Sequence, residues 1–301
     1  MKINKNTKKR RASELEISRL ETIILHIFFI LFSIAMLYPV LLAVGVSFSD
    51  QNSIIEYGYR IIPVNWSLEG YKLAFKSGEI LNAYKITILS TVIGTVLSVI
   101  IQMLYAYPLS RKSFKGRKFF TFYAYFVSLF SGGMVPWYIV CTKLLHLGNS
   151  FWALVLPSIF GFFNVVILRT FINSNVPDEM IEAARIDGCS EMGIFWKMVM
   201  PLSKAGMATI GLFAMLNYWN NYYLPMMLIN DKSLYNLQYY LQIIFLNIEE
   251  LAKYGNADAA DIPREVTRFA MCVITMGPIV LVYPFFQKYF VKGMVVGSVK
   301  G

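Results

Sequence analysis

The segment of this sequence with the most chemistry to offer is short, polar and placed between two apolar runs. It reads EAARIDGCSEMGIFWKMVMPL from residue 182 to residue 202. Its acids include Glu182 and Asp187 on a helix-prone stretch, and an acidic helix is suited to bind a basic cleft of a soluble partner. The alternative is an amphipathic helix resting on lipid headgroups, but such helices are usually rich in Lys and Arg. The segment therefore indicates binding chemistry rather than catalysis.

Local signals divide this segment into two short helices. Pro177 suits a first helical turn, where a missing N–H costs nothing, and Asp178 lies at the positive end of the helix dipole. Gly188 is expected to end the first helix, because glycine tolerates the left-handed conformation of a C-terminal cap. Ser190 can cap a second helix, which we expect to stop ahead of Pro201. The two helices are predicted to meet at a glycine elbow.

Other reactive side chains are too scattered to form a catalytic or metal site. Cys141, Cys189 and Cys272 lie in or beside different apolar runs, and neither CxxC nor metal-ligand spacing is present. His26 and His146 are equally isolated. The sequence also contains no P-loop pattern, so this chain cannot cradle nucleotide phosphates by such a loop of its own.

The composition places the polar segment in a membrane protein. Residues are 56% hydrophobic and only 15% charged, whereas a soluble domain carries about 25% charged residues. Six uncharged runs have about the length that crosses hydrocarbon, and they fall at 22–48, 86–110, 119–142, 144–168, 205–230 and 269–287. We therefore predict an all-α polytopic protein with spans near 20–48, 84–109, 119–142, 150–170, 203–229 and 267–289.

Basic residues set the expected orientation. MKINKNTKKRR opens the chain and SRKSFKGRK, residues 110–118, joins the second and third runs. The positive-inside rule places both in the cytoplasm, so the N-terminal tail 1–19, the loop 175–200 and the C-terminal tail 293–301 are all expected there. The net charge of +10 is concentrated at membrane ends, which favours lipid headgroups over nucleic acid as its partner.

Polar groups in and beyond the fifth span leave two interpretations open. In the span they gather near its outer half as Asn217, Trp219, Asn220, Asn221 and Tyr222. Aromatic faces beside amides can bind a sugar, but an interfacial aromatic belt with helix–helix hydrogen bonds is the simpler explanation. The external stretch 239–255 has a helical apolar period and is predicted to form a surface helix, either solvated or in contact with an external partner.

The polar segment resembles the EAA loop of binding-protein-dependent ABC importer permeases. The motif residues match in type and spacing, and they are Glu182, Ala183, Ala184, Gly188, Ile194, Val199, Pro201 and Leu202. The six-span layout, YWN at 218–220 and the terminal FVKGMVVGSVKG are similar to the carbohydrate-uptake group that includes the maltose-transporter permease. VYPFFQKYFVKG looks closest to its LplC/YtcP-type sugar permeases.

This resemblance implies a type I ABC importer permease fold with a cytoplasmic coupling helix. Glu182, Ala183, Ala184, Asp187 and Gly188 would then dock in a cleft of a cytoplasmic ATPase. The implied partners are a second homologous permease chain, two copies of a P-loop ATPase subunit, an extracellular solute-binding protein, an oligosaccharide substrate and membrane lipid. The chain itself would bind no cofactor, because ATP and Mg would be used by the ATPase subunits. The implied location is a bacterial plasma membrane.

Three alternatives remain at this stage. An ion-coupled secondary transporter usually needs ionisable groups inside the membrane, and the six runs contain no Asp, Glu, Lys or Arg. Backbone carbonyls and hydroxyls can nevertheless bind sodium. A membrane enzyme or scaffold would need a catalytic constellation at a membrane face; the paired acids Glu249–Glu250 and Asp258–Asp261 lie instead in an external loop. An ABC permease for a solute other than a sugar is the third alternative.

Overall fold

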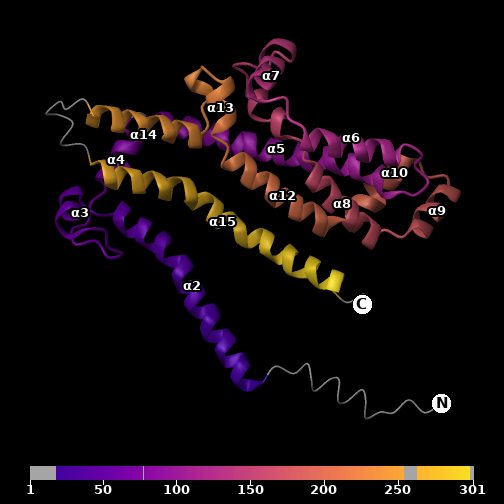
Figure 1. Cartoon of the computed structure of the whole chain (residues 1–301), viewed down its shortest axis with the longest axis horizontal. Coiled ribbons are helices and arrows are strands. Elements are labelled where there is room, and N and C mark those ends of the chain that lie inside the picture. Colours follow the sequence, from indigo (N-terminus) through magenta and orange to yellow (C-terminus); the bar gives the residue numbers. More distant parts are fainter. Residues whose placement is uncertain (1–17, 77, 254–262, 299–301) are drawn as a thin grey trace. The chain divides into compact units, whose positions relative to one another are not determined.

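Helices joined by loops form the part of the chain that its computed structural model describes, residues 18–76, 78–253 and 263–298. Most of the basic N-terminal tail, the acids Asp258 and Asp261, and residues 299–301 lie outside these ranges. The elements, labelled in Figure 1, are α2 (Arg19–Ser47), α3 (Gln51–Tyr57), α4 (Glu69–Phe75), α5 (Glu79–Ser110), α6 (Arg117–Leu129), α7 (Met134–Ile139), the π-helix η1 (Val140–Leu144), the 3-10 helices η2 (Phe151–Leu154) and η3 (Leu156–Ser158), α8 (Phe162–Asn175), α9 (Asp178–Ile186), α10 (Glu191–Ile194), the π-helix η4 (Phe195–Val199), α11 (Met200–Leu202), α12 (Lys204–Trp219), α13 (Tyr223–Leu228), the 3-10 helix η5 (Lys232–Leu234), α14 (Leu237–Lys253) and α15 (Arg264–Ser298).

Three of these helices can cross a membrane unbroken, and three more candidate spans are bent pairs. The long apolar helices are α2, α5 and residues 264–282 of α15. The pairs are α6 with α7 and η1, bent by 113°, η2 and η3 with α8, bent by 59°, and α10 to α11 with α12, bent by 81°. The described part of the chain therefore holds up to six spans by length and composition. Hydropathy detects a run of apolar residues but not a break within it.

The segment predicted as a span near 203–229 is not one continuous helix, because the structure interrupts it between α12 and α13. Asn220 ends α12, and the Asn221 side chain accepts a hydrogen bond from the Leu224 backbone N–H at the start of α13. Asparagine competes for backbone groups in this way, which favours a helix end over a helix interior. Three of the predicted substrate-path residues, Asn220, Asn221 and Tyr222, thus lie in the break itself.

The helix that follows Ser190 also differs from the expectation. It runs past Pro201 as far as Leu202 instead of stopping ahead of the proline. The π-helical turn Phe195–Val199 precedes the proline. Its i→i+5 hydrogen bonds have already interrupted the regular α-helical hydrogen-bond pattern. The missing N–H of Pro201 consequently costs little there.

The chain divides into two compact units, and the smaller one consists of residues up to 71 with residues 263–273. Ser18 and Glu21 form a capping box that starts α2. At the other end of α2, Val46 packs with Ile54 and with Val266 of α15. The outer surface of α2 is apolar and exposed over most of its length, as expected of a helix that faces lipid.

The larger unit, residues 72–262 and 274–301, is built around α5. This helix packs along α12 and α8, as Figure 1 shows. Its buried face is rich in small residues, Ser90, Thr91, Gly94 and Ser98 among them, which let neighbouring membrane helices approach closely. The Tyr218 ring of α12 lies directly over Gly94, where an added methyl group would come within 2.6 Å of it.

Side chains of α5 and α12 satisfy the open carbonyls of the broken fourth span. The Tyr218 hydroxyl donates to the Val155 carbonyl at 2.9 Å, and the Ser98 hydroxyl donates to the Ile159 carbonyl at 2.9 Å. The Gln102 amide also donates to the Ile159 carbonyl, at 3.3 Å. Because unpaired backbone groups are costly in a membrane, these bonds make the break between η3 and α8 a stable feature of the fold.

Candidate functional site: the α9–α10 elbow

The two short helices predicted from the polar segment are present as α9 and α10. Pro177 immediately precedes α9, and Asp178 and Glu179 occupy its first turn. Gly188 has a φ of 80°, and the backbone N–H groups of Gly188 and Cys189 donate to the Arg185 and Ala184 carbonyls. This left-handed glycine cap confirms the predicted elbow. The Ser190 hydroxyl caps α10 by accepting the Gly193 N–H at 3.1 Å.

The two faces of α9 divide the motif residues. Ile181 and Ala184 are buried against the body of the protein. The other predicted docking residues are exposed, namely Glu182, Ala183, Asp187 and Gly188. Ala184 therefore contributes to the seating of α9, while the rest of the motif is presented outward.

An exposed apolar side chain, Ile186, was missed by the sequence analysis. It is 86% exposed and lies three and four residues beyond Ala183 and Glu182, on the same outer face of α9. An apolar side chain this exposed is no part of the core, and it stands on the face of α9 that carries the exposed motif residues. The sequence does contain a signal for the exposure of Ile186. This residue follows Ile181 by five positions, a spacing that places the two isoleucines on opposite faces of a helix.

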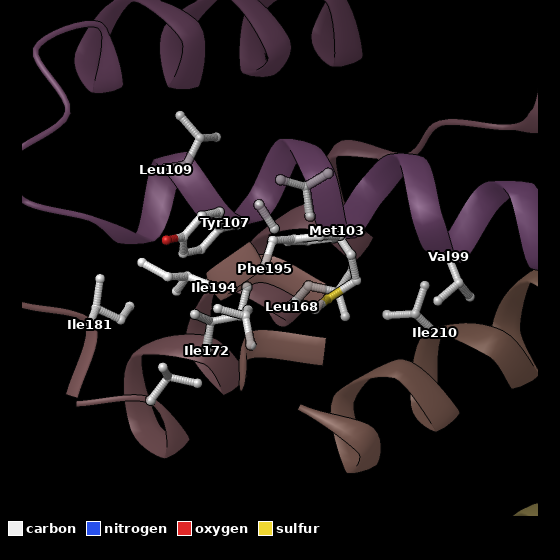
Figure 2. Packing of buried hydrophobic residues seen from close by; sticks show 14 of the residues in the cluster. Val99, Met103, Tyr107, Leu109, Leu168, Ile172, Ile181, Ile194, Phe195 and Ile210 are labelled. Carbon is white, nitrogen blue, oxygen red and sulfur yellow. The ribbon is translucent and has the colours of Figure 1, made fainter. Parts of the chain in front are cut away.

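An apolar cluster holds the elbow against the spans. Ile181 of α9 and Ile194 and Phe195 of the second helix meet Met103 and Tyr107 of α5, as Figure 2 shows. The Phe195 and Tyr107 ring centroids are 5.9 Å apart. The elbow is therefore packed against the membrane helices by buried apolar side chains and is not a loose loop.

Glu191 is the polar centre of the elbow. Its Oε1 accepts a hydrogen bond from Arg185 Nε at 2.6 Å, and its Oε2 accepts one from the Tyr107 hydroxyl at 2.9 Å. The Arg185 hydrogen bond lowers the pKa of Glu191 below its ordinary value. Glu191 is therefore ionised at neutral pH and fixed toward both partners. No local sequence signal marks Glu191, because its partner Tyr107 lies in a distant segment.

The five predicted substrate-path residues have different environments. Trp219 is buried, and its indole N–H donates to the Thr275 carbonyl at 3.0 Å. Asn220 is exposed and accepts a hydrogen bond from Gln238 at 3.2 Å. Asn217 and Tyr222 are exposed, and Asn221 is half-buried with its side chain capping α13. The structure thus gives Trp219 a partner within the chain and leaves Asn217, Asn220 and Tyr222 on the surface of α12 and of the break.

No group of three or more His, Cys, Asp or Glu side chains that could hold a metal ion occurs among the residues that the structure describes. The exposed side chains of the elbow are polar, small and apolar in turn. They offer carboxylates, a small flat patch at Ala183 and one apolar protrusion at Ile186.

Comparison with known proteins gives this surface a context. Residues 18–296 match the family described as "binding-protein-dependent transport system inner membrane component". The polygalacturonan/rhamnogalacturonan transport system permease protein YtcP of Bacillus subtilis (strain 168) is 36% identical over 288 residues, which are 94% of this chain and 99% of that protein. Protein LplC of the same strain is 37% identical over 264 residues, 87% of this chain and 89% of the relative.

A solved structure agrees in fold as well as in sequence. It is a chain of a bacterial ABC transporter involved in the import of the acidic polysaccharide alginate, with a TM-score of 0.79 and 28% identity over 91% of this chain and 99% of that one. The predicted resemblance and the predicted helical permease fold are confirmed. The chain belongs to the family of binding-protein-dependent transport system inner membrane components, the permease subunits of ABC importers.

Proposed function

We propose that this chain forms half of the translocation pathway for an oligosaccharide and that α9 docks in a cleft of a cytoplasmic ATPase. An importer of this family also contains a second permease, ATPase subunits and a solute-binding protein, and this chain is its membrane-embedded transport subunit rather than an enzyme. The stoichiometry proposed here is a heterodimer of homologous permeases with two ATPase copies. ATP and Mg are bound and used by those ATPases.

The observation that carries the docking proposal is the composition of the outer face of α9. Glu182 and Asp187 present negative charge, Ala183 allows close approach, and Ile186 projects an apolar side chain. Gly188 fixes the elbow that holds this face outward. A cleft with basic groups around an apolar floor would complement it in charge and in shape.

The proposed orientation puts this face in the cytoplasm together with both chain termini. Basic residues support it, since the link 110–118 between α5 and α6 carries Arg111, Lys112, Lys115, Arg117 and Lys118 and positively charged loops stay inside. In this orientation α14 lies outside the membrane. Its position and amphipathic sequence make it the proposed contact for the solute-binding protein.

The break between α12 and α13 is the proposed place where solute passes. Interrupted helices at membrane depth are tolerated where they line a protein-enclosed or water-filled cavity. Asn217, Asn220 and Tyr222 offer amides and an aromatic face next to this break, as a sugar would require. Trp219 and Asn221 would support these three by fixing the ends of the break.

The substrate class follows from the relatives. YtcP is named for the transport of polygalacturonan and rhamnogalacturonan, and the solved transporter is involved in the import of an acidic polysaccharide. We propose that this chain imports a polysaccharide-derived oligosaccharide. Uptake of labelled oligogalacturonides by cells with and without the chain tests this proposal, and uptake of an unrelated solute class in its place would refute it.

The docking proposal is tested by purifying the tagged chain from its own cells in mild detergent. Mass spectrometry is expected to find a second permease and a P-loop ATPase with it. Glu182→Lys should remove the ATPase while leaving the partner permease, because it reverses the charge presented to the cleft. Glu56→Lys, which changes an exposed acid of α3 in the same way, is the control and should retain both partners. A complex that keeps its ATPase after Glu182→Lys would exclude the proposed role of Glu182.

A further inference from the structure

One turn at the end of α5 is bonded to both ends of the α9–α10 elbow. Tyr107 and Arg111 are four residues apart and therefore lie on the same face. The Arg111 guanidinium carbon is 5.9 Å from the centre of the Tyr107 ring. Neither side chain belongs to the EAA motif: Tyr107 lies in the last turn of α5, and Arg111 is the residue that follows α5.

Arg111 fixes the beginning of α9. Its Nη1 donates to Asp178 Oδ1 at 2.8 Å and to the Val176 carbonyl at 3.4 Å, while its Nε donates to the Ser110 hydroxyl at 2.8 Å. The Arg111 side chain is only 6% exposed. A buried charge is costly unless it is paired and hydrogen-bonded, so the guanidinium holds Asp178 and Val176 in place as long as it stays buried.

Tyr107 fixes the other end through Glu191. The carboxylate of Glu191 accepts the Tyr107 hydroxyl with one oxygen and Arg185 Nε with the other. Arg185 lies in the last turn of α9, and Glu191 is the first residue of α10. One carboxylate thus joins three elements, α5, α9 and α10.

The Arg185–Glu191 ion pair contributes more to geometry than to stability. The Arg185 and Glu191 side chains are 38% and 57% exposed, and exposed ion pairs stabilise a fold little. A cavity of about 480 Å³ opens beside them, lined by Tyr107, Pro108, Arg185, Glu191 and Met192 among others. The apolar cluster also joins the elbow to α5, and Phe195 of that cluster lines this cavity together with Tyr107. The polar bonds beside the cavity add a directional connection between α5 and the first turns of the two short helices.

A nine-residue helix cannot transmit a displacement unless it is held at both ends. The chain itself connects α9 to α8 and, through the second helix, to α12. The contacts of Arg111 and Glu191 add α5, the helix that packs along both of these. Movement of α9 would then reach all three spans together.

We propose that Tyr107, Arg111 and Glu191 form a positioning clasp that couples displacement of α9 to α5. This inference rests on the proposed docking of α9 to an ATPase and assigns the three residues no contact with nucleotide or solute. The ATPase moves α9, the clasp carries the movement to α5, and α5 carries it to α12 and α8. Loss of the clasp uncouples the spans while the outer face of α9 stays intact.

The test uses the full complex purified with the tagged chain in lipid nanodiscs. Cys141, Cys189 and Cys272 are replaced by serine, and a bimane fluorophore is attached to Val92→Cys on the exposed face of α5, where Val92 is 56% exposed. The probe is Mg-ATP with orthovanadate, and the readouts are the bimane emission change and the amount of ATPase retained. Tyr107→Phe and Glu191→Gln remove clasp bonds with little change in volume.

A matched control lies two residues away. The Tyr105 hydroxyl also donates to a backbone carbonyl, that of Phe120 at 2.8 Å, on the side of α6. Tyr105→Phe therefore removes one hydroxyl hydrogen bond from the same helix without touching the elbow. It should keep the full emission change.

The clasp predicts that Tyr107→Phe and Glu191→Gln retain the ATPase but reduce the emission change by about fivefold or more, the lower end of typical coupling between sites. Arg111→Lys keeps the positive charge but loses the several N–H donors of the guanidinium, so it should give an emission change between those of the wild type and the other variants. An unchanged emission response in both variants would overturn the clasp while leaving α9 docking intact. Loss of the ATPase from the clasp variants would overturn it as well, because the residues would then shape the docking surface. A wild-type chain that purifies without any ATPase would instead refute the proposed function.

Discussion

Replacement of Gly94 by alanine tests how closely α5 and α12 must approach. The new Cβ would lie 2.6 Å from Cε2 and Cζ of Tyr218, whereas carbon atoms prefer about 3.5–4.0 Å. The ring must therefore move by about 1 Å. Tyr218 is 1% exposed and its hydroxyl donates to the Val155 carbonyl at 2.9 Å, so the movement also breaks a buried hydrogen bond.

The expected loss of stability follows from these two effects. Overpacking a core costs about 1–3 kcal/mol, and leaving a buried polar group unsatisfied costs about 1–3 kcal/mol. Alanine regains about 1 kcal/mol over glycine inside a helix. Gly94→Ala should therefore destabilise the protein by about 1–5 kcal/mol and lower its apparent melting temperature in detergent by several degrees.

The control is another helical glycine of the same unit. An added Cβ at Gly277 of α15 would meet no described heavy atom within 4 Å, so Gly277→Ala should melt at or slightly above the wild-type temperature. Tyr218→Phe should cost less in the Gly94→Ala background than alone, because the hydroxyl bond is already lost there. Equal melting temperatures for Gly94→Ala and Gly277→Ala would refute the reasoning.

Three further outcomes are expected at the elbow and the fifth span. Gly188→Ala should destabilise the elbow by about 1 kcal/mol, because φ is positive at this residue, and Gly188→Asn should destabilise it less. Limited proteolysis of the loop measures the difference between the two variants. Equal rates of cleavage would contradict the prediction. Trp219→Phe should lower thermal stability by about 1 kcal/mol through loss of the indole bond to the Thr275 carbonyl, with uptake retained; a loss of uptake at full stability would give the indole a direct role in transport. Cys189 is exposed. In a variant that lacks Cys141 and Cys272, Cys189 should react with an impermeant maleimide in inverted vesicles but not in intact cells. Labelling in intact cells would reverse the proposed orientation.

Much of this protein could be predicted from the sequence because its determinants are local. Uncharged length identifies apolar helices whatever their neighbours are, since the cost of a charge in hydrocarbon acts on each residue separately. Proline, glycine and serine at 177, 188 and 190 set the ends of α9 and α10 through their own backbone preferences. The elbow and its motif were predictable for that reason.

Other features depended on contacts between distant segments and became visible only in three dimensions. The breaks after Ile159 and Trp219 persist because side chains of other helices, or caps within the break, satisfy the freed backbone groups. The exposure of Ile186 and the burial of Arg111 depend on which face of each helix the fold covers. The sequence alone determined that short helices would meet at Gly188, since a residue's backbone preference is its own. Only the tertiary structure decided that Tyr107 and Arg111 hold them, because a bond between residues 84 positions apart has no signature in either segment.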